Sequence, residues 1–264
     1  MTVSRSWTAL LGLGLALSGA QAAPSFDDLL GGAGAHKSYV QPLADAATQL
    51  AGSGSFHGAR SKGIAGLDLG VKLVLAPVSS GDVPAGSILD QSEVKTVGLP
   101  MLTASKGLIK GLQVGARYLS LEASAEVGKL DYLGASLRFE LNELFHVPIL
   151  MPRIGLQADW NRLRVGEAVT NTTTGLDLIV SKSFVIVEPY AGLSLLMGKT
   201  ALDYHYDHDG ELPTAGHAAF DVDSDALRLA AGINITPFPL LRVNVEAARA
   251  DFTTVTAGVL LSLF

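Results

Sequence analysis

The segment from residue 203 to 211 holds the densest group of side chains that could bind a metal ion. Its candidate ligands are Asp203, His205, Asp207, His208 and Asp209. Carboxylate and imidazole groups bind Zn²⁺ or Ca²⁺ in proteins. The spacing departs from the calcium-loop pattern, because a histidine takes the third position and the glycine comes late. The alternative interpretation is a solvated acidic loop, which could still bridge divalent ions at a lipopolysaccharide surface.

Candidate catalytic groups are few. A hydrolytic site needs a serine or aspartate beside a histidine, and three of the six histidines, His205, His208 and His217, lie in or near this segment with no serine spaced beside them. The chain has no cysteine, which excludes a thiol nucleophile, a Cys-ligated metal centre and a disulfide scaffold. We therefore predict that the protein is not an enzyme and holds no cofactor.

The composition narrows the class of protein. The net charge is −6 and the pI is about 5.5, which argues against nucleic acid as a partner because phosphates need a basic surface. Hydrophobic residues make up 48% of the chain and charged residues 17%, below the ~25% charged residues of a typical soluble protein. Mean hydropathy is +0.34. The chain is either an unusually apolar soluble protein or a membrane protein.

Residues 1–23 are predicted to be a secretory signal peptide. They carry one charge, Arg5, followed by an apolar run at 8–17 and by small residues at Ala20 and Ala22 that suit cleavage. The run is too short to cross a bilayer, which needs ~20 residues. We expect an exported mature chain without a transmembrane helix.

Apolar and polar residues alternate through most of the mature chain. In the first such segment Leu67, Leu69 and Val71 share one face, and Asp68 and Lys72 share the other. The same alternation recurs at 112–119, 133–141, 154–161, 227–235 and 241–248. In an exported chain this period indicates strands of an outer-membrane β-barrel, with one face toward lipid and one toward the lumen.

The polar face is predicted to line the lumen, and it mixes small residues with charges of both signs. The lumen-facing charges would be Lys72, Arg117, Arg138, Arg228 and Arg242, with Asp68, Glu140, Asp159, Asp177 and Glu246. Five bases facing five acids would pair across a narrow lumen.

The predicted fold is all-β, an antiparallel transmembrane barrel of about ten strands. We place the strands at 64–76, 89–98, 108–119, 131–142, 150–163, 171–182, 185–198, 222–236, 239–250 and 253–264. Longer polar links are expected at 77–89, 119–131, 163–170 and 199–221, and a broad turn at 99–106. An even strand count puts the start of the first strand and the end of the last strand both on the periplasmic side, with short turns there and longer loops outside.

Residues 24–62 are expected to precede a barrel domain at 63–264. Apolar residues recur there at helical spacing across Pro42: Tyr39, Leu43, Ala46 and Leu50. Two interpretations stay open: a plug that enters the lumen from the periplasm, or a helix that caps the barrel in the periplasm.

The order of these segments resembles an uncharacterised family of bacterial outer-membrane-type β-barrel proteins, known only as a domain of unknown function. The matching stretches are Tyr39–Leu43, Gly66–Leu69, Leu178–Lys182, Pro189–Leu193, Gly198–Thr200 and Thr256–Gly258. The resemblance implies a small helix before a barrel of about ten or more strands, and it brings no catalytic residues. A plug at 24–62 also resembles fatty-acid-transporter-type barrels.

Together these features predict an integral outer-membrane protein of a Gram-negative-type bacterium. Its expected partners are outer-membrane lipid, lipopolysaccharide and the barrel-assembly machinery, which reads a terminal aromatic such as Phe264. The expected function is a narrow passive channel or a structural barrel. The alternatives are a loop-mediated surface binding protein for divalent ions or lipopolysaccharide, and a soluble periplasmic lipid carrier. The sequence predicts neither a substrate nor an oligomeric state.

Overall fold

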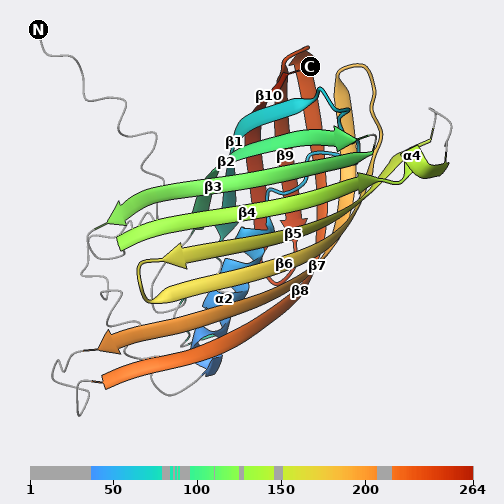
Figure 1. The fold of residues 1–264 in the computed structure, drawn as a ribbon. Helices are drawn as coiled ribbons and strands as arrows, with labels where there is room; N and C mark the ends of the chain where they lie inside the picture. The colour runs from blue at the N-terminus through green and yellow to red at the C-terminus, as the bar shows by residue number, and fades with distance from the viewer. Residues whose placement is uncertain are drawn as a thin grey trace, which may run out of the picture.

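A computed structural model describes residues 37–78, 84, 85, 87, 89, 96–109, 111–124, 128–145, 151–206 and 216–263. Within these ranges the chain forms a helix, α2 (Lys37–Gly52), a single helical turn, α4 (Asn142–Phe145), and ten strands (Figure 1). Neither described helix is long and apolar enough to cross a membrane. The predicted signal peptide at 1–23 and the terminal Phe264 lie outside the described residues.

The ten strands form one closed antiparallel barrel, which confirms the predicted fold class. Each strand pairs with its neighbours in the chain, and β1 closes the barrel against β10. The strands are β1 (Leu67–Pro77), β2 (Thr96–Ile109), β3 (Leu112–Ser124), β4 (Gly128–Glu140), β5 (Arg153–Val165), β6 (Val169–Ser181), β7 (Val187–Tyr206), β8 (Gly216–Phe238), β9 (Leu241–Arg249) and β10 (Thr253–Leu263). Closure leaves no unpaired edge, which a sheet in lipid requires.

We name the two ends of the barrel by their strands. At the proximal end β1 begins and β10 ends, and at the distal end the β7–β8 hairpin projects beyond its neighbours (Figure 1). The predicted link at 199–221 is mostly part of this hairpin, since β7 and β8 stay paired out to Tyr206 and Gly216. Long strands thus replace much of the loop expected there.

The second strand lies later in the chain than its predicted place at 89–98. β2 occupies the residues expected to form a broad turn at 99–106, and Pro100 sits inside it, paired with Leu73 of β1. The proline is tolerated because pairing of β2 with β3 begins only at Leu102, so no ladder partner on that side needs its missing N–H.

Outward side chains form an apolar belt around the barrel. Leu137, Leu176 and Leu227 are each about half exposed, and Tyr118 and Trp160 lie at the distal edge of the belt, where the outward face becomes polar. Beyond this edge the exposed outward residues include Glu122, Lys129, Arg164, Lys199, Asp221, Asp223 and Asp225. At the proximal end exposed apolar residues continue into the turns. The belt is therefore displaced toward the proximal end, and the distal part of the barrel has a polar exterior.

A matched pair of substitutions tests the position of this belt. Ala158→Arg puts a charge on the outward face between Leu137 and Leu176 and should reduce the free energy of unfolding by about 2–4 kcal/mol. Ala201→Arg puts the same charge outward beyond the belt, opposite Asp221, and should cost about 0–1 kcal/mol. Urea unfolding in lipid vesicles, followed by the fluorescence of Trp160, measures both. Equal losses would contradict the assigned belt.

Candidate functional site

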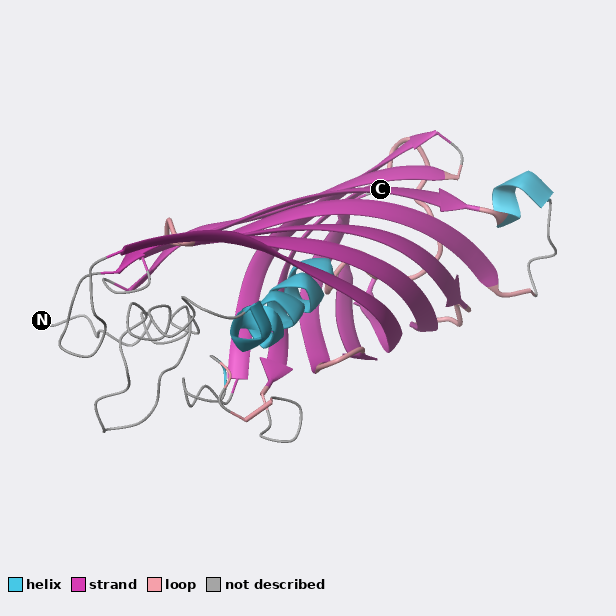
Figure 2. Cartoon of the chain, turned by 90° about the horizontal axis from the view of Figure 1, so that it is seen from below, coloured by secondary structure: helices cyan, strands magenta, loops and turns pink. Residues whose placement is uncertain are grey.

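The helix α2 lies inside the barrel and not beneath it (Figure 2). Near its amino end, Val40 and Ala44 belong to one buried apolar cluster with Leu202 and Val222 from the distal parts of β7 and β8. One to two turns later, Leu50 belongs to a cluster with side chains of β1, β2 and β4. The helix therefore runs down the lumen from the distal end.

The chain after α2 continues down the lumen to the proximal end. Phe56 is fully buried in a cluster with Ile179 and Tyr190. The backbone N–H of Ala59 donates to Ser181 Oγ at 2.9 Å, and Ser181 is the last residue of β6. Residues 37–62, which we call the plug segment, thus pass through the whole lumen. The amino end of α2 lies at the distal end of the barrel, opposite the end where β1 begins.

Four side chains of the barrel wall hold backbone carbonyls of the plug segment, and we call them the carbonyl clamp. The bonds are Tyr132 Oη to Ala51 O at 2.8 Å, Arg117 Nη1 to Ser53 O at 2.8 Å, Lys72 Nζ to Gly54 O and Phe56 O at 2.7 and 2.8 Å, and Arg138 Nη2 to Ser55 O at 3.1 Å. The last carbonyls of a helix have no intrahelical donor and carry the negative end of its dipole. Only Ala51 O belongs to the last turn of α2, and it accepts from the neutral Tyr132 hydroxyl. The cations from β1, β3 and β4 bind the carbonyls of residues 53–56, beyond the end of the helix.

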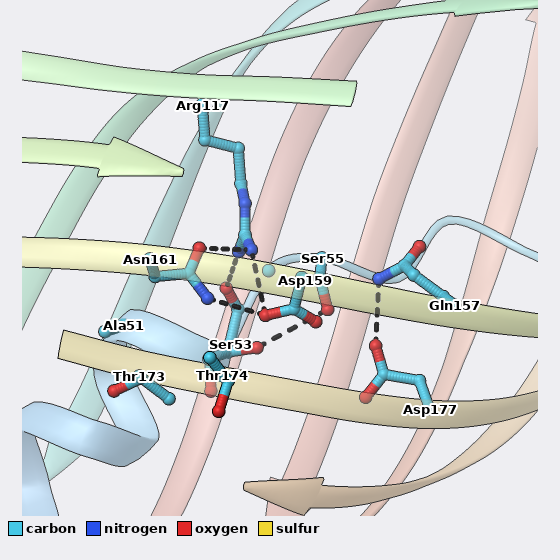
Figure 3. A network of polar contacts seen from close by, with 12 residues as sticks. Ala51, Ser53, Ser55, Arg117, Gln157, Asp159, Asn161, Thr173, Thr174 and Asp177 are labelled. Carbon is cyan, nitrogen blue, oxygen red and sulfur yellow. Dashed lines mark hydrogen bonds and ion pairs between the residues drawn. The ribbon is translucent and has the colours of Figure 1, made fainter. Parts of the chain in front are cut away.

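Acidic and amide side chains on the neighbouring wall hold the clamp in place (Figure 3). Arg117 Nη2 donates to Asn161 Oδ1 at 2.7 Å and lies 3.6 Å from Asp159 Oδ2. Arg138 Nε donates to Gln157 Oε1 at 3.0 Å, and the amide of Gln157 donates to Asp177 at 2.9 Å. Each clamp arginine thus links a plug carbonyl to an acid on β5 or β6.

A second ion pair contacts the plug from the opposite wall. Arg228 and Glu246 form a salt bridge in which both side chains are almost completely buried. The guanidinium of Arg228 lies 4.9 Å from the centre of the Phe56 ring, a cation–π contact. Tyr190 Oη donates to Glu246 at 2.9 Å. The wall therefore binds both the backbone and the aromatic anchor of the plug segment.

All ten charges that the sequence assigned to the lumen point inward. Nine are buried and Arg242 is partly exposed. Toward the proximal end, Asp68 pairs with Lys62 and lies 3.8 Å from Arg242, while Glu140 pairs with Arg153 and accepts the Ser61 N–H at 2.8 Å. The structure thus brings these charges against the plug segment and one another.

Sequence reasoning missed several residues that shape this contact. Gln157 and Asn161 belong to a predicted inner face, but nothing local marks these two residues or Tyr132 as partners of the plug segment. Inward glycines are the one usable signal: a Cβ at Gly192 would lie 2.3 Å from the Phe56 ring, and one at Gly198 would lie 2.0 Å from Thr48. Both glycines leave room for a body inside the barrel.

The predicted metal ligands are only partly within the described chain. Asp203 is exposed on the outward face of β7, and the backbone of His205 pairs with that of His217 on β8. Asp207, His208 and Asp209 lie outside the described residues. Across the described ranges no group of three or more His, Asp or Glu side chains is placed to hold a metal ion, so this site stays a prediction.

The proximal mouth contains a cavity of about 340 Å³. His57, Lys62, Asp68 and Arg242 line it, together with the β8–β9 turn. At its inner side the Gln113 amide lies 3.2 Å from His57 Nε2. A hollow of only about 20 Å³ lies farther in, between residues 54–57 and the wall. The plug segment thus fits tightly in the barrel interior and loosely at its mouth.

Comparisons with known proteins give one family match and several likenesses to solved structures. A family described as of unknown function (DUF6588) matches residues 81–263, and no curated protein matches the chain. The chain is similar in fold to the N-terminal β-barrel domain of Pseudomonas aeruginosa OprF, with 10% identity, 76% of this chain and 100% of that one covered, and a TM-score of 0.32. It is also similar to Neisserial surface protein A, with 9% identity, 75% of this chain and 96% of that one covered, and a TM-score of 0.33. A third similar structure is the translocator domain of the autotransporter NalP from Neisseria meningitidis, with 9% identity, 84% of this chain and 95% of that one covered, and a TM-score of 0.38.

Substitution of Arg117 tests the clamp. Arg117→Met leaves Asp159 buried without its cation and Ser53 O without a donor, so the free energy of unfolding should fall by about 3–5 kcal/mol. Lys199→Met is the control, because the Lys199–Asp221 pair is more than half exposed on average and should be worth about 0–1 kcal/mol. Adding Asp159→Asn to Arg117→Met should restore part of the loss. Similar losses in the two single variants, measured by urea unfolding in vesicles, would show that the clamp adds no stability.

Proposed function

The chain belongs to the family of unknown function DUF6588, and from this premise we propose that it is an integral outer-membrane protein that forms a narrow passive channel closed by its own plug segment. The carbonyl clamp is the observation that carries the proposal. Its bonds hold residues 51–56 across the middle of the lumen. No catalytic or cofactor role is assigned.

The dimensions of the barrel favour closure at rest. A barrel of eight strands is just wide enough for its own side chains to fill, and ten strands add little width. A helix with its side chains is ~10 Å across. Residues 46–56 are all buried, so the wall surrounds the plug segment on every side at this depth. A solute can pass only if the segment moves.

The chemistry of the contact favours a plug that can be displaced. If the wall only had to pack against a permanent plug, apolar side chains would fill the space at a lower desolvation cost than charged ones. Here the wall presents Lys72, Arg117 and Arg138 to the plug, and these groups can exchange plug carbonyls for water without leaving a donor unsatisfied. This supports a closed channel over a purely structural barrel.

The outward surface supports the proposed partners. The apolar belt suits bilayer lipid. The exposed residues Asp221, Asp223 and Asp225 lie on the distal side of Leu227, just beyond the belt, at the depth of outer lipid headgroups. Divalent ions would link such carboxylates to lipopolysaccharide phosphates. A soluble lipid carrier would instead have to leave the half-exposed belt leucines in water.

Conductance in planar bilayers tests closure. The intact protein should give small or no current steps, and deletion of residues 37–62 should raise the conductance at least several-fold with weak ion selectivity, because the five acids and five bases on the wall nearly cancel. Resistance to unfolding before heating on a detergent gel verifies that the deletion variant is folded. Phe56→Ala, which opens space beside the plug without removing it, should raise leak more modestly. Large currents from the intact protein would refute closure.

Cell fractionation tests the location. Because the apolar belt needs lipid, the mature protein should sediment with outer membranes and require detergent for release. Recovery in the soluble periplasm would favour the lipid-carrier alternative.

A further inference from the structure

The amino end of α2 lies in the part of the barrel that projects beyond the apolar belt. We propose that this end opens on the outside of the cell, so that residues 37–62 pass through the lumen from the cell surface to the periplasm before β1 begins. The barrel would thereby present the amino end of α2, at Lys37, on the cell surface. The proposal rests on the proposed outer-membrane location, but not on whether the lumen conducts.

The offset of the belt identifies the distal end as the outer one. Past the exposed Met197, β7 continues for nine residues to Tyr206, which is about 30 Å of strand. At the proximal end Val185 is 99% exposed and Phe238 is 66% exposed in the turns, so apolar surface reaches the last residues there. Outer-membrane barrels have short periplasmic turns and longer extensions outside. The distal end therefore matches the extracellular side.

The direction of the plug segment is given by its contacts at successive depths. Gln41 Nε2 donates to the backbone O of Asp223 at 2.9 Å, and Asp223 is among the outward-facing acids beyond the belt. At the other end the Ser61 N–H donates to Glu140, the last residue of β4, at 2.8 Å. One pass of chain thus connects the two mouths.

The described chain leaves no space for a second pass beside α2. All residues from Ala46 to Gly52 are buried, and this stretch covers nearly two helical turns, so every face of the helix contacts the wall. Lys37 and Ser38 are exposed. The amino end of α2 at Lys37 is therefore accessible from the distal mouth.

Single cysteines test the topology, because the chain has none of its own. Lys37→Cys is compared with Glu167→Cys in the distal β5–β6 turn and with Val185→Cys in the proximal β6–β7 turn, all three exposed positions. Intact cells are treated with a bulky membrane-impermeant maleimide, and labelling is compared with that after permeabilisation. Labelling of Lys37→Cys and Glu167→Cys should be the same before and after permeabilisation. Val185→Cys should be labelled only after it.

Two outcomes would overturn the proposal. In the first, Glu167→Cys is labelled on intact cells but Lys37→Cys and a second variant, Ser38→Cys, require permeabilisation. In the second, only Val185→Cys is labelled on intact cells, which would invert the barrel. Neither outcome changes the conductance result, so failure of the topology is distinguishable from failure of channel closure. Heat-dependent gel mobility establishes that each variant is folded.

Discussion

The carbonyl groups after the last turn of α2 set the central constraint on this barrel. These carbonyls lie in the lumen, where they are not paired in the hydrogen-bond pattern of a helix or a sheet. Burying them unpaired would cost about 1–3 kcal/mol each. Lys72, Arg117 and Arg138 supply the donors. Buried cations in turn require acids, and Asp159 and Asp177 on the adjoining strands satisfy this need directly or through an amide. The charge pattern of the inner wall is thus explained by the chain it encloses.

Closure of the sheet makes this arrangement possible. Pairing of β1 with β10 satisfies the backbone on both edges, so the alternation of side chains can separate two environments completely. Leucines such as Leu137 and Leu176 face outward, while Lys72 and Glu246 face inward from strands of the same sheet. A shift of one residue in register would put buried charges into lipid, which strongly selects the observed pairing.

The sequence predicts local features well and long-range partners poorly. Period-two alternation correctly oriented Arg117, Asp159 and Arg228, because facing depends only on strand parity. The predicted position of the second strand was wrong. β2 continues through Pro100, and whether a strand tolerates this proline depends on where β3 begins to pair. The polar residues at 199–221 predict a link, but most of them lie in paired strands whose outward face is polar beyond the belt. The direction of the plug segment depends on contacts such as Ser61 with Glu140, 79 residues apart, and no local pattern encodes it.

Apolar packing holds the first half of the plug segment and polar contacts hold most of the second half. This difference determines which half can loosen first. Val40 and Ala44 pack in an apolar cluster with Leu202 and Val222 near the distal end, so their release would expose apolar surface at a cost of roughly 25 cal/mol per Å². After the buried Phe56, residues 57–62 are held mainly by polar contacts with the wall, and water can replace those bonds at little net cost. The 340 Å³ cavity at the proximal mouth lies beside these residues. Loosening of the plug segment would therefore begin from the proximal side, while the apolar cluster keeps α2 anchored near the distal mouth.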